Sequence, residues 1–264
     1  MLSLNQPIPS RSAALGRFRG FGSEKEETIR RPGVVEDRSL AGLIGSWDAI
    51  KRLGAYPQAL DKRFVDEHIL SIEYSARDVE RFSVHLVEFQ DEPDFTANAG
   101  RLLSLLINHG KDEAYTIHTR HLDRRNQLDC LGYGNTKTLI IEGDTGSYCG
   151  GRMISGSISV MGSTGMKCGE DMVGGNIQVM ENAGFGLGNR MEGGSISVKG
   201  NADELCGLWM GGGSIEVFGN AGAKCGEEME GGEIRVHGKI EYVNLFNKQG
   251  GEIYEKGRLV GIKW

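Results

Sequence analysis

Residues 225–238 read Cys-Gly-Glu-Glu-Met-Glu-Gly-Gly-Glu-Ile-Arg-Val-His-Gly, and this phrase returns at intervals of nineteen residues through the second half of the chain. Its apolar and glycine positions are refilled at each step without an insertion. An internal repeat takes precedence over local patterns, because each copy is expected to form one unit of a stacked structure. The repeated apolar residues are Met153, Met172, Met191, Met210 and Met229; Ile158, Ile177, Ile196, Ile215, Ile234 and Ile253; and Val160, Val179, Val198, Val217 and Val236.

A repeat of this length favours a β-helix over a helical repeat. Helical-hairpin repeats need about 33 residues or more, and glycine costs a helix roughly 1 kcal/mol per residue relative to alanine. The stretch from Ser157 to Val160 alternates polar and apolar residues, as a strand with one buried face does. The sequence therefore predicts a mainly β fold, a right-handed parallel β-helix of about six 19-residue coils, preceded by a small α+β N-terminal region.

Glycine and asparagine mark the expected corners of each coil. Double glycines such as Gly231-Gly232 are expected to supply a positive φ or a close backbone approach. Asn182, Asn201 and Asn220 share one repeat position. We expect a left-handed corner there, because asparagine tolerates that conformation.

The uneven distribution of glycine divides the chain, since nine of the 41 glycines precede residue 131 and 32 follow. We expect a partly irregular N-terminal arm over residues 1–60, a small α+β cap over 61–130, and the β-helix domain over 131–264. The arm is open between a mobile terminus and a segment that orders on a partner. Apolar residues at helical spacing predict an amphipathic helix over 38–53.

Within the cap, alternating patterns predict strands over 68–74 and 82–89, and a further strand over 115–118. Thr96 is placed to cap a helix that runs to about residue 109. At the other end, bulky apolar residues over 239–246 replace the cysteine–methionine part of the repeat. We expect them to plug the open end of the solenoid, because an uncapped end exposes unpaired strands.

Charge and hydropathy limit the location and the partners. The formal net charge of −6 argues against nucleic acid or an anionic membrane as a partner. No apolar run approaches the ~18 residues that a membrane span needs. The first residues lack the apolar core of a signal peptide. These features predict a cytoplasmic protein with no membrane span.

Four of the five cysteines share one repeat position, which Leu187 fills in the remaining coil. Metal sites in proteins use closely spaced pairs that converge on one point, whereas a periodic column makes a line. Buried free cysteine behaves as a small hydrophobic residue. We therefore interpret the column as structural, with a metal or redox role as the alternative and disulfides not expected in a reducing compartment. Its members are Cys149, Cys168, Cys206 and Cys225.

His118, His121 and Asp123 form the other candidate metal site. Residues three apart on a strand point to opposite faces, which argues against a shared ligand role. The chain has no Gly-x-Ser-x-Gly, P-loop, dinucleotide-binding or His-Glu-x-x-His motif. We therefore predict no catalytic, cofactor-binding or metal-binding residues.

The repeat reads Gly-x-x-Met-x-Gly-Gly-x-Ile-x-Val-x-Gly-Asn-Ala-Gly over residues 207–222 and in its copies. This pattern resembles the glycine-rich G-x-G-x-G β-helix family, and the resemblance covers about residues 131–264. The family includes the β-helical subunit of formylmethanofuran dehydrogenase. It also includes the C-terminal domain of the glutamate synthase large subunit, with its stand-alone relatives. The regular form, with methionine before the double glycine, is more similar to the formylmethanofuran dehydrogenase member.

The resemblance implies a non-catalytic structural and docking subunit of a multi-subunit oxidoreductase in one-carbon metabolism, as in methanogenesis. Molybdopterin and iron–sulfur clusters would then lie on the partner subunits, with no cofactor on this chain. The alternative is a stand-alone glutamate-synthase-type subunit of an amidotransferase complex. An independent enzyme such as a hydrolase is a third class, which the missing nucleophile motif disfavours. Self-association of the chain stays open.

Overall fold

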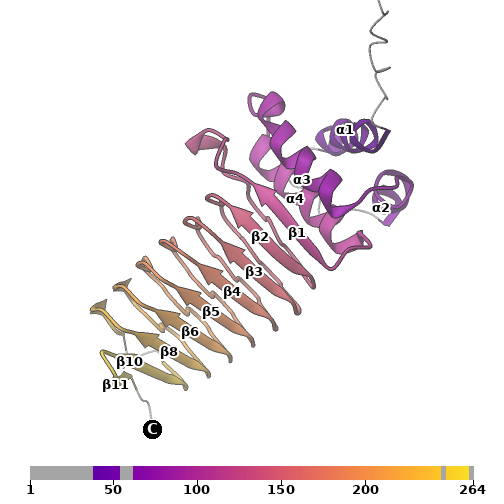
Figure 1. Cartoon of the computed structure of the whole chain (residues 1–264). Coiled ribbons are helices and arrows are strands. Elements are labelled where there is room, and N and C mark those ends of the chain that lie inside the picture. The colour runs from indigo at the N-terminus through magenta and orange to yellow at the C-terminus, as the bar shows by residue number, and fades with distance from the viewer. Residues whose placement is uncertain (1–37, 54–61, 245–247, 262–264) are drawn as a thin grey trace, which may run out of the picture. The chain divides into compact units, whose positions relative to one another are not determined.

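A computed structural model of the chain describes residues 38–53, 62–244 and 248–261 (Figure 1). Residues Asp37–Trp264 form one compact unit. Most of the predicted N-terminal arm, residues 1–37 and 54–60, lies outside the described residues. The helix predicted over 38–53 is confirmed, as α1 (Arg38–Ile50) followed by the short 3-10 helix η2 (Lys51–Leu53).

Three more α-helices and an aromatic cluster make up the rest of the N-terminal region. They are α2 (Lys62–His68), α3 (Ala76–His85), with the 3-10 helix η3 (Leu86–Phe89), and α4 (Phe95–His109). The helix predicted to run to about residue 109 is therefore confirmed, but the cap predicted at Thr96 is wrong: Asp94 is the N-cap residue, and the Thr96 hydroxyl lies inside the helix and donates to the Asp129 carboxylate over 3.2 Å. The buried ring of Trp47 on α1 stacks on Phe89 at 5.3 Å and meets Phe95 edge-on at 5.8 Å between centroids. Offset and edge-on aromatic pairs of this kind add stability beyond area burial.

The strands predicted over 68–74 and 82–89 are wrong. Residue 68 ends α2, and the second segment falls in α3 and η3. Ser75 begins α3 with a capping box, in which the Asp78 amide donates to the Ser75 hydroxyl and the Ser75 amide donates to the Asp78 carboxylate. Val79, Phe82 and Leu86 are buried at spacings of three and four residues, which is the apolar stripe of a helix. The apparent alternation was too short to separate the two patterns.

The strand predicted over 115–118 is confirmed as β1 (Ala114–His118). It pairs in parallel with β2 (Thr138–Glu142), so the sheet begins one strand before the first repeat at Leu139. The backbone amide of His118 donates to the Ser83 hydroxyl on α3 over 3.0 Å. Helix α3 thereby covers the outer edge of β1 and protects it from pairing with another chain.

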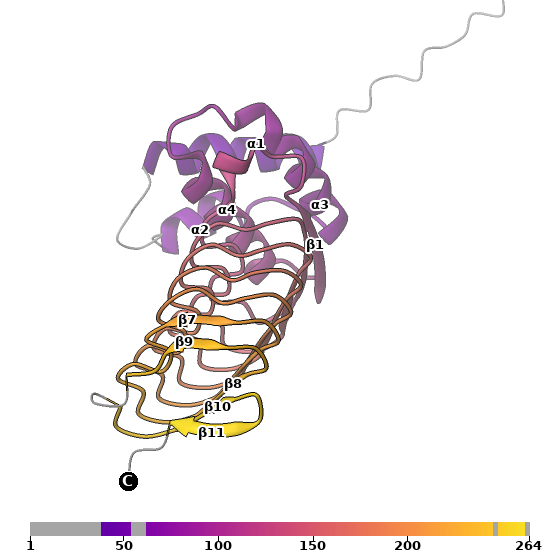
Figure 2. The ribbon, with the colours of Figure 1, turned by 90° about the vertical axis from the view of Figure 1, so that its left-hand side faces the viewer.

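The parallel β-helix itself is confirmed (Figures 1 and 2). Its main sheet is parallel throughout from β1 to β10. Between β2 and β10, each strand residue pairs with the residue nineteen positions ahead in the next strand, as Ile177 does with Ile196. The 3-10 helix η4 (Arg124–Asn126) lies between β1 and β2. After β2, the strands of this sheet are β3 (Ser157–Val160), β4 (Asn176–Val179), β5 (Ser195–Val198), β6 (Ser214–Val217), β8 (Glu233–Val236) and β10 (Glu252–Glu255).

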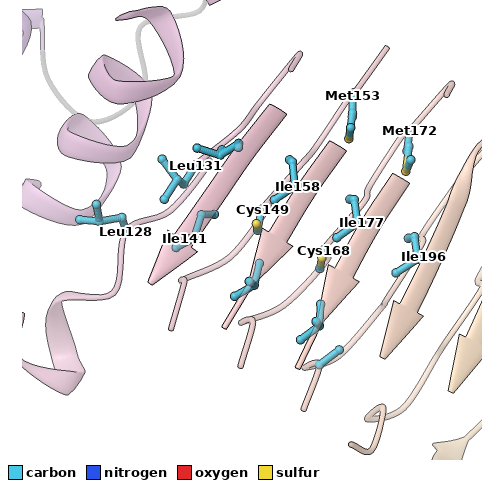
Figure 3. Packing of buried hydrophobic residues seen from close by; sticks show 14 of the residues in the cluster. Leu128, Leu131, Ile141, Cys149, Met153, Ile158, Cys168, Met172, Ile177 and Ile196 are labelled. Atoms are coloured by element: carbon cyan, nitrogen blue, oxygen red, sulfur yellow. The ribbon is translucent and has the colours of Figure 1, made fainter. Parts of the chain in front are cut away.

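Each of the five coils that begin at β2 to β6 contributes five inward residues to one continuous core. In the first coil they are Leu139, Ile141, Thr145, Cys149 and Met153, all buried. Copies of each position in the next coils stack on them, so that cysteine lies beside cysteine and isoleucine beside isoleucine (Figure 3). The threonine position forms a second, narrower ladder of backbone bridges, which ends in β7 (Ala221–Ala223) and β9 (Ile240–Tyr242).

The C-terminal end is closed by a reversal of the chain. Strand β11 (Arg258–Gly261) returns antiparallel to β10 and ends the main sheet. In the segment predicted as a plug, residues 240–242 instead continue the coil as β9, with Ile240 buried and Tyr242 exposed. Leu245 and Phe246 lie outside the described residues.

The asparagine corners are not left-handed, so that prediction is wrong. Asn182, Asn201 and Asn220 are absent from the residues with positive φ. Their side-chain oxygens instead accept from the backbone of the next coil, as Asn182 Oδ1 does from the Asn201 amide at 2.9 Å and Asn201 Oδ1 from the Asn220 amide at 2.7 Å. Asparagine is used here to satisfy a backbone donor at a corner where the strand ladder ends.

Two glycines in one coil differ in why glycine is needed: both have a positive φ, but only one of them also packs closely against the core. Gly186 and Gly188 both have positive φ, 74° and 64°. A Cβ at residue 188 would lie 2.5 Å from Cδ1 of Ile215 in the core, whereas a Cβ at residue 186 would lie 3.3 Å from Cγ of the flexible Lys167 side chain and 4.0 Å from Cβ of Asn189.

We expect Gly186→Ala to lower the free energy of unfolding by about 1 kcal/mol, the cost of a left-handed Cβ. Gly188→Ala should lower it by about 1–3 kcal/mol more, because it also overpacks the core. Chemical denaturation of the two variants beside the wild type measures both values. Equal losses would mean that Ile215 moves aside freely, contrary to the packing described here.

Candidate interaction surface

Two columns of residues on the outside of the solenoid have left-handed backbone conformation without being glycine. The first repeats the position of Tyr148, and only Gly186 departs from it. The second repeats the position of Arg152 and contains no glycine over its five members from residue 152 to residue 228, whereas Gly134, with φ 65°, holds the matching position in the turn before them. The φ values of the non-glycine members of both columns lie between 51° and 63°. The non-glycine members are Tyr148, Lys167, Leu205 and Lys224 in the first column, and Arg152, Asp171, Arg190, Trp209 and Glu228 in the second.

This conformation is costly for residues with a Cβ, by about 1–3 kcal/mol each. The turn requires the backbone to be left-handed, and glycine would meet that requirement without the cost, as Gly186 does. None of the nine residues is β-branched, which is the type that tolerates this region least. The fold alone therefore does not explain why side chains are kept at these nine positions.

Contacts among these side chains offset little of the cost. Asp171 lies between two arginines, with Arg152 Nε at 3.5 Å and Arg190 Nε at 2.8 Å from its carboxylate oxygens. Trp209 Nε1 donates to the Glu228 carboxylate over 2.8 Å. The arginine side chains are about half exposed or more, and exposed pairs contribute only about 0–1 kcal/mol.

Large apolar and aromatic side chains gather beside the two columns. The exposed fractions are 59% for Ile154, 52% for Met166, 52% for Val173 and 44% for Trp209. Two cations lie over aromatic rings, with Lys167 Nζ 5.4 Å from the Tyr148 ring centroid and Arg152 Cζ 6.0 Å from that of Tyr133. Tryptophan, tyrosine, methionine and arginine are enriched at the centres of protein interfaces. We call the two columns, with Tyr133, Ile154, Met166 and Val173, the turn face.

The outer side of the main sheet has a different composition. On β3, β4 and β5 its outward residues are small or uncharged: Ser157, Ser159, Asn176, Gln178, Ser195 and Ser197. None of these strand residues has a positive φ. The sheet side therefore serves as an internal comparison for the turn face.

The cysteine column lies in the core, as its periodicity predicts. Cys149, Cys168, Cys206 and Cys225 are at most 1% exposed, and all are free thiols. They lie in one line along the coils, with Leu187 between Cys168 and Cys206, and do not converge on one point; Figure 3 shows Cys149 and Cys168 on neighbouring coils. In the part of the chain that the structure describes, no group of three or more His, Cys, Asp or Glu side chains is placed to hold a metal ion.

The structure separates the predicted histidine and aspartate candidates. His118 lies between two carboxylates, with Nε2 at 3.1 Å from Glu80 on α3 and Nδ1 at 3.0 Å from Glu142 on β2. Burial, and then the nearby His118, lower the pKa of His121. His118 and His121 line one cavity of about 350 Å³, whereas Asp123 lines another of about 430 Å³. His118 therefore connects the helical region to the sheet.

No family model matches the chain, and no curated protein shows significant sequence similarity to it. Among the described residues, the longest helix is α4 with 15 residues, and none is both long and apolar enough to cross a bilayer.

The turn face could not be predicted from the sequence, because an outward position with a left-handed φ does not require one particular residue type. The one available signal is that none of the five residues at the Arg152 position, from residue 152 to residue 228, is glycine, although the sequence around each of them is rich in glycine.

The strain at the turn face can be measured at Trp209. Trp209→Gly and Trp209→Ala both remove the hydrogen bond to Glu228, so their difference reports the backbone alone. We expect the glycine variant to be more stable than the alanine variant by about 1 kcal/mol, because only alanine keeps a Cβ at positive φ.

The matched control is Glu216 on β6, an outward strand position without positive φ. There we expect the opposite order, with glycine less stable than alanine by about 0.5–1 kcal/mol. Urea denaturation of the four variants gives both differences. The same order at both positions would remove the argument for strain at residue 209.

Proposed function

We propose that this chain is a non-catalytic docking subunit that binds a partner protein of a multi-subunit enzyme through its turn face. The observation that carries the proposal is the set of nine non-glycine residues held in left-handed conformation. Strain of this kind collects at functional sites. Here glycine would relieve it without disturbing the core, because the side chains point outward.

The solenoid is suited to hold such a surface in place. Each coil donates backbone hydrogen bonds to the coil before it directly beneath the turn face, as the Gly169 amide does to the Cys149 carbonyl at 2.9 Å and the Gly188 amide to the Cys168 carbonyl at 2.8 Å. Successive turns are therefore about 4.8 Å apart. A partner meets side chains whose spacing is set before binding, which reduces the ordering cost of association.

The resemblance of the repeat supports a finer proposal for the complex. The pattern over residues 207–222 is similar to that of the β-helical subunit of formylmethanofuran dehydrogenase. We accordingly propose an oxidoreductase complex of one-carbon metabolism, in which other subunits carry molybdopterin and iron–sulfur clusters. A glutamate-synthase-type amidotransferase complex is the alternative that the same experiment distinguishes.

The test is purification of the tagged chain from its native host, followed by identification of the proteins that stay with it. We expect a molybdopterin-containing subunit among them, whereas a glutamine-hydrolysing or flavin-binding synthase subunit would assign the alternative complex. Catalytic turnover by the purified chain alone would contradict a non-catalytic role.

The surface is tested with paired variants. Arg190→Gly combined with Trp209→Gly should leave the chain folded and reduce partner recovery at least tenfold, a loss typical of interface hot spots. The control combines Ser159→Lys with Gln178→Glu on the sheet side, where outward substitutions change stability by about 0.5 kcal/mol or less. We expect the control to keep its partner. The reverse result would assign docking to the sheet side.

A further inference from the structure

Leu187 divides the cysteine column into two pairs, and the two cysteines of each pair lie on neighbouring coils. Backbone hydrogen bonds between consecutive coils define the order of the column, which reads Leu131, Cys149, Cys168, Leu187, Cys206 and Cys225. Figure 3 shows the first pair, with the sulfur atoms of Cys149 and Cys168 on neighbouring coils and both in the core. The fifth cysteine, Cys130, is outside the column and is held beside Arg101.

Among the four cysteines of the column, only two pairings are within reach of a disulfide. Neighbouring coils are about 4.8 Å apart, within the Cα separation of roughly 4.4–6.8 Å that a disulfide spans. Cys149 and Cys168 lie on neighbouring coils, as do Cys206 and Cys225, because the Gly169 amide donates to the Cys149 carbonyl and the Gly226 amide to the Cys206 carbonyl. Cys168 and Cys206 are separated by Leu187 and by two coil spacings, about 9.6 Å, which is beyond the limit of ~7 Å.

We propose that the two pairs are dithiol–disulfide couples, and that a low-molecular-weight disulfide of the glutathione type oxidises them to Cys149–Cys168 and Cys206–Cys225. Each bond would join two neighbouring coils covalently inside the core. The inference does not depend on the proposed docking function. If the cysteines served only as small apolar residues, their arrangement in two pairs would have no chemical consequence.

Oxidation of each pair takes two thiol–disulfide exchange steps. One protein thiolate attacks the small disulfide, which releases one small thiol and leaves a mixed disulfide on the protein. The neighbouring protein thiolate then attacks the protein sulfur of that mixed disulfide and releases the second small thiol. The two protein thiols lose two electrons and two protons, and the small disulfide is reduced to two thiols.

Oxidation should be slow in the native fold, because all four thiols are buried, although hydrogen bonding to Cys168 lowers the pKa of Cys149. Hydrogen bonding to Cys149 together with burial raises the pKa of Cys168, and hydrogen bonding to Cys225 together with burial raises the pKa of Cys206. The thiolate is the attacking species. Exchange must therefore wait for a coil to open locally, and such openings are easiest near the ends of a structure.

The two ends are not equally secured. Next to the first pair, the Ser104 hydroxyl of α4 donates to the Cys130 carbonyl over 2.8 Å and accepts from the Gly132 amide over 2.9 Å. These bonds fasten the turn that precedes Cys149 to the helical region. Among the described residues, the second pair is followed by the last coil and the β10–β11 hairpin, with no helix packed against them. We therefore expect Cys206–Cys225 to form before Cys149–Cys168.

The experiment treats the native full-length chain with glutathione disulfide and quenches samples with acid over time. Free thiols are alkylated in denaturant, and the disulfide-linked peptides are mapped by mass spectrometry. We expect Cys206–Cys225 first, then Cys149–Cys168, and a thermal midpoint several degrees higher in the oxidised protein. The midpoint rises because each bond restrains the unfolded chain.

Two variants keep the result decisive. Cys168→Ala should abolish the first disulfide and leave the second unchanged, which separates the couples. Leu187→Cys makes the column continuous, so we expect mixed pairings through residue 187 and loss of the single pattern.

Three results would overturn the proposal. One is a dominant Cys168–Cys206 or Cys130 disulfide in the wild type. Another is retention of all four column thiols under conditions that oxidise the same chain unfolded in urea. The third is a lower thermal midpoint after oxidation, which would mean that the bonds form only in a disrupted core.

Discussion

The structure depends on the backbone register between coils. Because each strand from β2 onward pairs with residues nineteen positions away, every inward residue lies directly over its counterpart. A strand that slipped by one residue would turn its inward side chains outward, since strand side chains alternate with a period of two. The same register aligns Asn182 with the Asn201 amide and the cysteine sulfurs with one another. Core, corners and thiol pairs thus share one cause.

The sequence is informative wherever burial forces a residue type. The isoleucine, valine, cysteine and methionine positions all lie in the core because their periodicity records which residues face inward. Glycine at the position of Gly188 is equally readable, since a Cβ there would enter the space of Ile215. The β-helix and its register could therefore be predicted without coordinates.

The rest could not be predicted, for two physical reasons. Short alternating segments such as 82–89 satisfy a strand pattern and a helical stripe at once, and tertiary packing on Trp47 and β1 decides between them. The turn face is hidden for the opposite reason. An outward residue such as Arg190 or Trp209 meets no core atom, so the sequence does not show its backbone conformation. The candidate surface emerged only from the dihedral angles.

Because every coil has the same length, the number of coils determines distances along the axis of the solenoid. Each coil advances the backbone by about 4.8 Å, and nothing in a coil's own packing records how many coils precede it. Duplication or loss of a whole nineteen-residue unit would leave every remaining coil with suitable neighbours. It would, however, move the turn-face residues beyond that point by one step relative to the helical region. In a lineage that changes by whole repeats, the number of coils would set the distance between two bound partners, while the fold would stay the same.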